Sequence, residues 1–282
     1  MKIIDAHLHY SKVESFFQCV ENETLVDYSA EGYLKEAKEN EVVASVCMGL
    51  VESTAGAFPD PQSPTPMIAD LTEKAPPGMH VCLGINPYTL SEKSLDEASA
   101  LIESAGNVVG VKIYAGYYHF DVNDPIYSPV YKFALEHDLT VAVHSGSTYS
   151  KKGLLKYAQP LSIDELAVTY PDLRIMICHM GVPWVYDACE VVAKNENVYI
   201  DLSGMLVGST EIINNMSSQP LLIDRYKQAV IYLSEYDKLL FGTDWPLVPM
   251  GAYIDFIKKI IPAERHEQVF YENAIRVYKL KV

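Results

Sequence analysis

The first apolar run of the chain carries two histidines in an alternating pattern. Residues 3–10 read IIDAHLHY, so one residue separates His7 from His9, and Asp5 precedes His7 by two positions. Because side chains alternate across a β-strand, the pattern predicts that Asp5, His7 and His9 share one face. Ile4 and Ala6 would then share the opposite face and pack against helices. The two imidazoles could be buried packing residues or two ligands of one metal ion, and the HxH spacing alone does not decide between them.

More polar residues lie at or near the ends of later apolar runs. His144 follows TVAV, His179 follows IMIC, Asp244 follows LLFGT and Lys112 lies within VVGVKIY. One histidine at a strand end more often forms a structural hydrogen bond than binds a metal. Burying five such groups without a common partner would cost roughly 1–3 kcal/mol each. We therefore predict a metal centre formed by His7, His9, His144, His179 and Asp244.

Two further residues have more than one interpretation. Lys112 could be a metal ligand, a cation that binds the substrate, or an ion-pair partner inside the fold. Asp201 ends the run VYID, and it could orient a ligand histidine or cap the next helix.

Alternating strand and helix patterns provide the elements that would position these side chains. Short runs rich in β-branched and aromatic residues predict eight strands, at 2–7, 42–49, 79–85, 108–114, 140–145, 174–180, 198–204 and 239–245. Amphipathic segments between them predict helices at 29–40, 91–104, 124–138 and 183–195. Eight such units of about 35 residues predict an α/β fold, a (β/α)₈ TIM barrel in a single domain spanning 1–282. An open doubly wound sheet is the alternative, but no strand is followed by GxGxxG. In a barrel the polar residues above would meet at the C-terminal ends of the strands, where active sites lie.

Composition excludes several classes of protein. The 282 residues carry a net charge of −15, which argues against nucleic-acid binding and gives no basic patch for anionic membranes. We expect no secretory signal peptide, and no apolar run is long enough to span a bilayer. Five cysteines without CxxC spacing do not form a disulfide framework. We expect a cytoplasmic protein with a small-molecule substrate, and a homo-oligomer is left open.

The motifs DAHLH, GVKIY, VHSG, CHMG and FGTDWP occur in this order. Together they resemble the amidohydrolase superfamily, in its amidohydrolase-2 branch, over nearly the whole chain. The resemblance implies one divalent metal ion, most often zinc, with His7, His9, His144 and Asp244 as ligands. His179 would face the metal-bound water or join the ligands.

Relatives with two metal ions carry a carbamylated lysine on the fourth strand, which bridges the metals. The GVKIY context of Lys112 resembles the mononuclear branch instead, where this lysine contacts the substrate.

The resemblance also implies a reaction. The branch contains hydrolases of small esters, lactones and amides, in which Asp244 would act as general base and acid and His179 as the second catalytic residue. It also contains non-oxidative decarboxylases similar to aminocarboxymuconate semialdehyde decarboxylase, so decarboxylation of a small carboxylic acid, aromatic acids included, is the alternative. A metal-binding barrel without turnover is a third hypothesis. The residues expected to bind the substrate are Lys112, Tyr114, Tyr10 and Trp245, with Tyr117 beside them.

Overall fold

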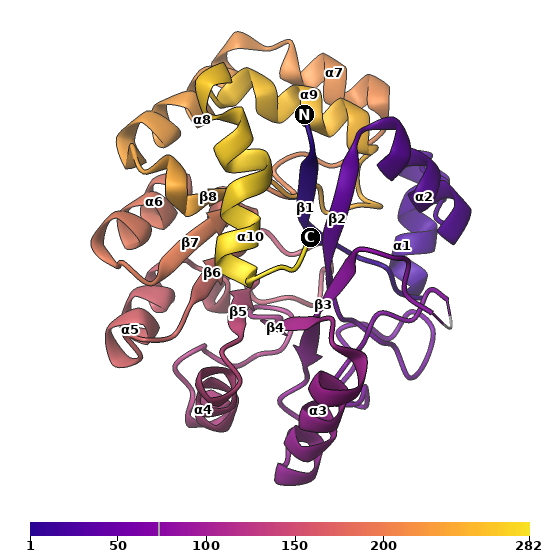
Figure 1. Cartoon of the computed structure of the whole chain (residues 1–282), viewed down its shortest axis with the longest axis vertical. Helices are drawn as coiled ribbons and strands as arrows, with labels where there is room; N and C mark the ends of the chain where they lie inside the picture. Colours follow the sequence, from indigo (N-terminus) through magenta and orange to yellow (C-terminus); the bar gives the residue numbers. More distant parts are fainter. Residues whose placement is uncertain (73) are drawn as a thin grey trace.

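Eight parallel strands form one sheet, and helices follow the strands along the chain (Figure 1). The computed structural model describes residues 1–72 and 74–282. Strands that follow one another in sequence are neighbours in the sheet, in the order β1 to β8. The strands are β1 (Ile3–Leu8), β2 (Val42–Met48), β3 (Met79–Ile85), β4 (Val108–Ile113), β5 (Thr140–Val143), β6 (Ile175–Ile177), β7 (Val198–Asp201) and β8 (Leu239–Leu240). The prediction of a (β/α)₈ barrel is confirmed.

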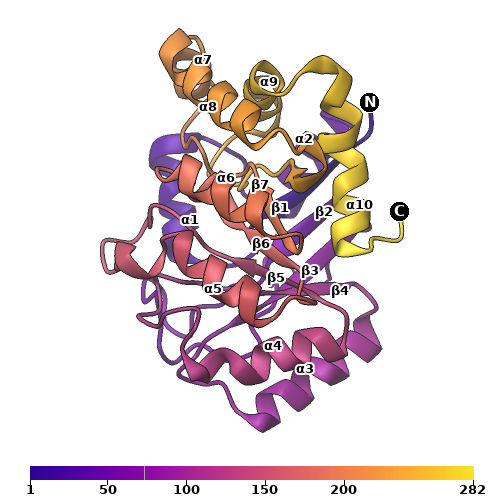
Figure 2. The ribbon, with the colours of Figure 1, turned by 90° about the vertical axis from the view of Figure 1, so that its left-hand side faces the viewer.

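Helices surround the sheet in both views (Figures 1 and 2). The α-helices are α1 (Glu14–Cys19), α2 (Ala30–Glu39), α3 (Glu92–Ala105), α4 (Ser128–Glu136), α5 (Leu161–Thr169), α6 (Val185–Lys194), α7 (Thr210–Ser217), α8 (Pro220–Leu233), α9 (Met250–Ile260) and α10 (Asn273–Tyr278). Shorter helical segments are η1 (Val20–Thr24), η2 (Pro125–Tyr127), η3 (Leu155–Tyr157), η4 (Cys178–Gly181), η5 (Tyr236–Lys238), η6 (Ala263–Arg265) and η7 (Gln268–Glu272). Ser29 and Ser91 cap the N-termini of α2 and α3 with their side chains. Among the residues described here, no helix is long and apolar enough to cross a membrane.

Apolar side chains form one layer on the outer face of the barrel sheet and another on its inner face. The outer layer joins alternate strand residues, such as Val111 and Val141, to the surrounding helices. We call the inner layer the interior cluster. Its residues on the strands, or directly after one in the case of Cys178, are Ile4, Ala6, Ala44, Val46, Met48, Cys82, Ala142, Met176, Cys178 and Leu240. Residues of α10, among them Val277 and Tyr278, join the interior cluster. The Thr140 hydroxyl also donates to the Val277 carbonyl at 2.8 Å, so α10 packs against the start of β5 and covers that end of the barrel.

The barrel closes between β8 and β1 through an irregular segment. The Ala6 N–H donates to the Phe241 carbonyl at 2.9 Å, and the His9 N–H donates to the Trp245 carbonyl at 2.7 Å. In the pairing of β1 with β2, Asp5 lies opposite Ser45 and Leu8 lies opposite Cys47. β1 therefore contains one residue more than β2 over this stretch, which is a β-bulge.

This bulge corrects the prediction for the faces of β1. Ile4 and Ala6 belong to the interior cluster and do not face helices, whereas Ile3 packs in the outer layer. Asp5 therefore points away from the interior, and the expectation that it shares a face with His7 is wrong. An extra residue reverses the alternation of side chains, so His7 and His9 face the mouth of the barrel after Asp5 has faced outward.

The position of Ile4 gives a test of the interior cluster. We expect Ile4→Ala to lower the free energy of unfolding by about 2–5 kcal/mol, because Ile4 is fully buried and its loss leaves a cavity. Val43→Ala on the neighbouring strand is the control, since Val43 is 42% exposed and its truncation should change stability by less than about 0.5 kcal/mol. Denaturation by urea measures both. An Ile4 variant as stable as the Val43 variant would contradict the inward orientation of Ile4.

Candidate metal centre

The polar residues singled out by the sequence lie at the C-terminal ends of their strands. His7 is the last residue but one of β1, and His9 directly follows that strand. His144 follows β5 directly, and Asp201 is the last residue of β7. Asp244 lies in the segment after β8. The barrel therefore gathers side chains that are up to 237 positions apart in the sequence, from His7 to Asp244.

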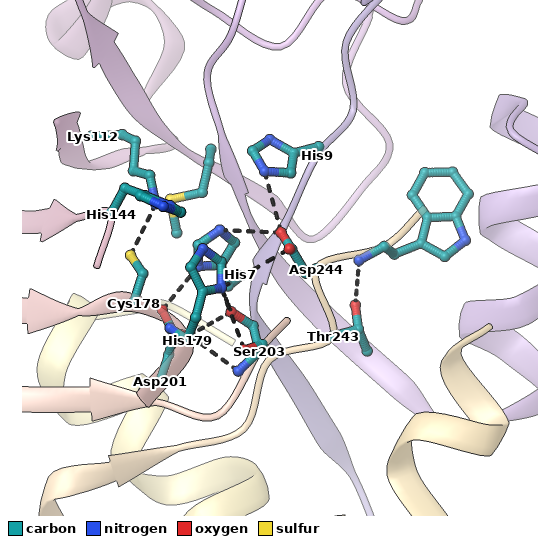
Figure 3. Close-up of polar contacts among 12 residues, drawn as sticks. His7, His9, Lys112, His144, Cys178, His179, Asp201, Ser203, Thr243 and Asp244 are labelled. Carbon is teal, nitrogen blue, oxygen red and sulfur yellow. Dashed lines mark hydrogen bonds and ion pairs between the residues drawn. The ribbon is translucent and has the colours of Figure 1, made fainter. Parts of the chain in front are cut away.

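His7, His9 and Asp244 form one cluster (Figure 3). The Asp244 Oδ1 atom lies 3.5 Å from His7 Nε2 and 3.2 Å from His9 Nε2. All three side chains are buried. Backbone contacts fix the arrangement, because the Asp244 N–H donates to the His7 carbonyl at 2.8 Å. Asp244 has a left-handed backbone with φ +70°, a conformation that costs free energy and is often found at functional sites.

Asp201 orients His7 from the side opposite to Asp244. His7 Nδ1 and Asp201 Oδ2 are 2.8 Å apart. The other oxygen of Asp201 accepts the backbone N–H groups of His179 at 2.9 Å and Ser203 at 3.1 Å. Of the two roles that the sequence left open for Asp201, the structure favours orientation of a histidine. A carboxylate in this position fixes which nitrogen of the ring is free.

Burial sets the protonation states of the site. It lowers the pKa of His7 to about 3 and also lowers the pKa values of His144 and His179, so these imidazoles are neutral at pH 7. Burial alone would raise the pKa of Asp244, but the surrounding histidines, His179 first, hold this pKa below its ordinary value. Neutral imidazole and ionised carboxylate are the forms that bind metal ions.

Two lone pairs face each other in this cluster. The ionised Asp201 carboxylate can only accept, so His7 carries its proton on Nδ1 and has a lone pair on Nε2. That lone pair faces Asp244 Oδ1, and neither atom has a hydrogen-bond partner among the described residues. Two buried acceptors at 3.5 Å repel each other unless a cation lies near both. The donor set therefore fits a divalent metal ion, with imidazole nitrogen and carboxylate oxygen as ligands.

His144 and His179 lie beside this cluster. The His179 ring centroid is 4.7 Å from that of His7 and 4.9 Å from that of His144. His179 Nδ1 contacts the Ser203 hydroxyl at 2.9 Å and is 3.9 Å from Asp244 Oδ2. His144 Nε2 lies 3.1 Å from the Ser147 carbonyl, and its ligand atoms are outside the compact groups of possible ligands. Metal binding by His144 and His179 stays a prediction.

A cavity of about 470 Å³ opens beside the cluster. His9, His144, His179 and Asp244 all line it, so the candidate ligands are accessible to a small molecule. Its apolar wall includes the aromatic rings of Phe16, Phe58, Tyr114 and Tyr117.

Lys112 lies in the cavity wall on β4 and is only 1% exposed. Its ammonium donates to Cys178 Sγ at 2.9 Å and lies 5.5 Å from the centre of the Tyr114 ring. Among the described residues no carboxylate forms an ion pair with Lys112, so the structure gives no support to the ion-pair interpretation, and the other two interpretations stay predictions.

Two of the residues expected to bind substrate do not reach the cavity. The Trp245 ring is fully buried and its Nε1–H donates to Glu36 Oε1 at 3.1 Å, behind the segment that carries Asp244. Tyr10 is also buried, with its ring 5.6 Å from that of Tyr33. Both side chains point into the packing under α2, so we no longer assign them to the substrate. Tyr114 does line the cavity, as predicted, and its hydroxyl donates to the Gly49 carbonyl at 2.7 Å.

Comparison with known proteins identifies the family. The sequence profile described as Amidohydrolase, of the amidohydrolase-2 type, matches residues 4–280. The chain belongs to the amidohydrolase family. No curated protein sequence matches this amidohydrolase.

Solved structures agree with the barrel fold. A TIM-barrel protein from Bordetella bronchiseptica is 20% identical, with a TM-score of 0.73 and 99% of each chain covered. A probable 2-pyrone-4,6-dicarboxylic acid hydrolase from Acinetobacter baumannii is 17% identical, with a TM-score of 0.66 over 99% of this chain and 100% of that one. A dihydroxybenzoic acid decarboxylase from a Polaromonas species, with bound manganese, is 14% identical, with a TM-score of 0.64 over 99% and 97%. At sequence identities this low, the similarity to these structures supports the fold and not a shared activity.

Several residues of the site escaped the sequence reasoning. Ser203 holds His179 and follows Asp201 by two positions, so the alternation of β7 could have pointed to it. Phe16, in the short helix α1, and Phe58, between β2 and β3, line the cavity from segments to which the sequence analysis assigned no helix or strand. Gly204 has φ +58°, and a Cβ atom there would lie 2.6 Å from His179 Nδ1 and 2.8 Å from Asp244 Oδ2.

Gly204 provides a matched test of this geometry. We expect Gly204→Ala to weaken metal binding at least tenfold, because the new methyl group displaces His179 and Asp244. Gly106→Ala is the control: Gly106 has φ +66°, but no atom of residues 1–72 or 74–282 would lie within 4 Å of a Cβ atom there. Both variants bear a backbone strain of about 1–2 kcal/mol, and only the first disturbs the site. Titration of the metal-free protein with zinc measures the two affinities, and equal losses would contradict the crowding argument.

Proposed function

We propose that this amidohydrolase is a metal-dependent hydrolase of a small ester, lactone or amide that carries a carboxylate. The observation that supports this most is the Asp244 carboxylate, which contacts both histidines of the HxH pair and also lines the cavity. One side chain thus lies between the candidate metal ligands and the space for a substrate. A general base for an attacking water needs this position.

His7, His9 and Asp244 would hold the metal ion, with His144 and His179 as further candidates. The nitrogen and oxygen ligands suit zinc, although manganese is bound in the Polaromonas decarboxylase. When bound, the ion supplies a Lewis acid that makes hydroxide available near neutral pH.

Three side chains of the candidate metal centre have separate roles in the proposed reaction. Asp201 keeps His7 in the tautomer that presents Nε2 to the cluster. Asp244 accepts the proton of the water and returns it to the leaving group. His179, which the Ser203 hydroxyl holds, hydrogen-bonds the water or the substrate carbonyl.

Lys112 binds the carboxylate of the substrate in this proposal. Its ammonium is buried in the cavity wall and has a thiol as its hydrogen-bond partner, so it gains more from an anion than a solvated lysine would. Rings such as Phe58 and Tyr117, whose centroids are 5.0 Å apart, offer apolar surface to the rest of a ring-sized substrate.

Decarboxylation of a small aromatic acid is the second candidate. Several similar structures are decarboxylases, including the 2,6-dihydroxybenzoate and 5-carboxyvanillate enzymes. Hydrolysis and decarboxylation would use the same cluster, because both develop negative charge that a Lewis acid stabilises.

Product analysis in ¹⁸O-labelled water separates the two reactions. A panel of lactones, esters, amides and aromatic carboxylates is incubated with zinc- or manganese-loaded protein. We expect one labelled oxygen in the organic product and no carbon dioxide. Stoichiometric carbon dioxide without labelled product would establish decarboxylation instead. Asp244→Asn serves as the control and should lower turnover by about 10²–10⁴-fold, since an amide cannot accept the proton.

The assignment of Lys112 gives a second prediction. Lys112→Met should raise KM for a carboxylate substrate by about 10–100-fold, the effect of losing a charged hydrogen bond worth roughly 1.5–3 kcal/mol. The KM for the uncharged methyl ester or amide of the same substrate should change little, and the metal content should stay the same.

Lys238→Met is the matched control, because Lys238 is also buried, at 8% exposure, but lies outside the cavity lining. A loss of metal in the Lys112 variant alone would instead support a metal-ligand or bridging role for this lysine.

A further inference from the structure

Asp5 is a buried carboxylate that the proposed reaction does not use. It is fully shielded from solvent and points away from the cavity, since its pocket lies between β1 and the segment after β8. Asp5 Oδ1 accepts the Thr243 N–H at 2.9 Å and the His7 N–H at 3.2 Å. Asp5 Oδ2 accepts the Thr243 hydroxyl at 2.5 Å. One carboxylate therefore contacts the backbone next to two candidate metal ligands, His7 and Asp244.

On the β1 side, Asp5 stabilises the bulge that orients His7. The extra residue between Asp5 and Leu8 disrupts the ladder with β2, so an N–H group in the bulge needs another acceptor. The Asp5 carboxylate supplies that acceptor to His7. A regular strand in place of the bulge would turn His7 to the opposite face, away from the mouth of the barrel.

On the β8 side, Asp5 acts through Thr243. The Thr243 hydroxyl donates to Asp5 and accepts the Trp245 N–H at 2.9 Å, so it holds the residues on both sides of Asp244. The left-handed backbone of Asp244 costs free energy and persists only where its surroundings determine it. The contacts of Thr243 belong to those surroundings (Figure 3).

We propose that Asp5 is a positioning residue for the metal centre: its carboxylate fixes the backbone of His7 directly and that of Asp244 through Thr243, which keeps His7 Nε2 and Asp244 Oδ1 close enough to bind one cation. This inference rests on the metal centre proposed above. Asp5 contacts neither the cation nor the substrate and acts only through the two ligands.

The test is cobalt binding to the metal-free protein, followed by visible absorption. We expect Asp5→Asn to weaken Co²⁺ binding by about 10–100-fold and to change the visible spectrum, because loss of a group that orients the ligands has effects of this size. Asp5→Ala removes every acceptor and should weaken binding further. Thr243→Val keeps the size of the side chain, removes only the hydroxyl link and should have an intermediate effect.

Asp60→Asn is the matched control for the burial of a carboxylate. Asp60 is 4% exposed and accepts the N–H groups of Ser53 and Gln62, both at 2.9 Å, but it touches none of the candidate ligands. The Asp60→Asn variant should have a lower melting temperature but an unchanged affinity for Co²⁺ and an unchanged visible spectrum. An Asp5→Asn protein with wild-type affinity and spectrum would show that Asp5 only stabilises the fold, and would overturn the proposal.

Two outcomes need a second measurement. If Asp5→Ala does not fold, Asp5→Asn and Thr243→Val decide the question. If the wild-type protein binds no Co²⁺, the metal centre itself is wrong, and crystals of metal-free Asp5→Asn test Asp5 separately. A displaced His7 ring or Asp244 side chain would then support the positioning role, and unchanged positions would overturn it.

Discussion

The junction between β8 and β1 is the part of the barrel on which the site depends. β8 has only two ladder residues, so closure there relies on individual hydrogen bonds and not on a long regular ladder. The irregular backbone frees His7 and Asp244 from the alternation of a strand and lets both reach the same point. Burial raises the pKa of Asp5 to about 7, and the hydrogen bonds from Thr243 and His7 oppose this rise because they stabilise the ionised carboxylate.

The opposite end of the barrel has the complementary role. The interior cluster and α10 fill that end with apolar side chains and provide packing that no ligand needs to complete. Barrels of this kind commonly separate stability from chemistry in this way. The separation explains how the mouth can hold buried acceptors such as His7 Nε2 and Asp244 Oδ1, which have no hydrogen-bond partner in the described part of the chain, while the fold remains intact. Their unfavourable proximity is a cost that a bound cation would remove.

The sequence predicted the barrel because its strands and helices have clear periodic patterns. It also predicted that His7, His9 and Asp244 lie close together, since parallel strands must bring their C-terminal ends together. It failed for Asp5, because strict alternation cannot anticipate a bulge whose extra residue is visible only in the pairing with β2. Trp245 and Tyr10 show a second limit: residues next to a ligand in sequence can point into the layer behind it, and this depends on loop conformation.

The position of Lys112 bears on the choice between hydrolysis and decarboxylation. Decarboxylation moves negative charge out of the leaving carboxylate, so an ammonium that binds this group stabilises the substrate more than the transition state. Such a contact would slow the reaction. A carboxylate that is retained throughout hydrolysis carries no such penalty, and its binding energy can orient the scissile bond towards Asp244. A buried ammonium with only a thiol partner among the described residues therefore favours a substrate whose carboxylate survives the reaction. For a decarboxylase in this barrel, the carboxylate that leaves would have to lie away from Lys112, on the side of His9 and Asp244.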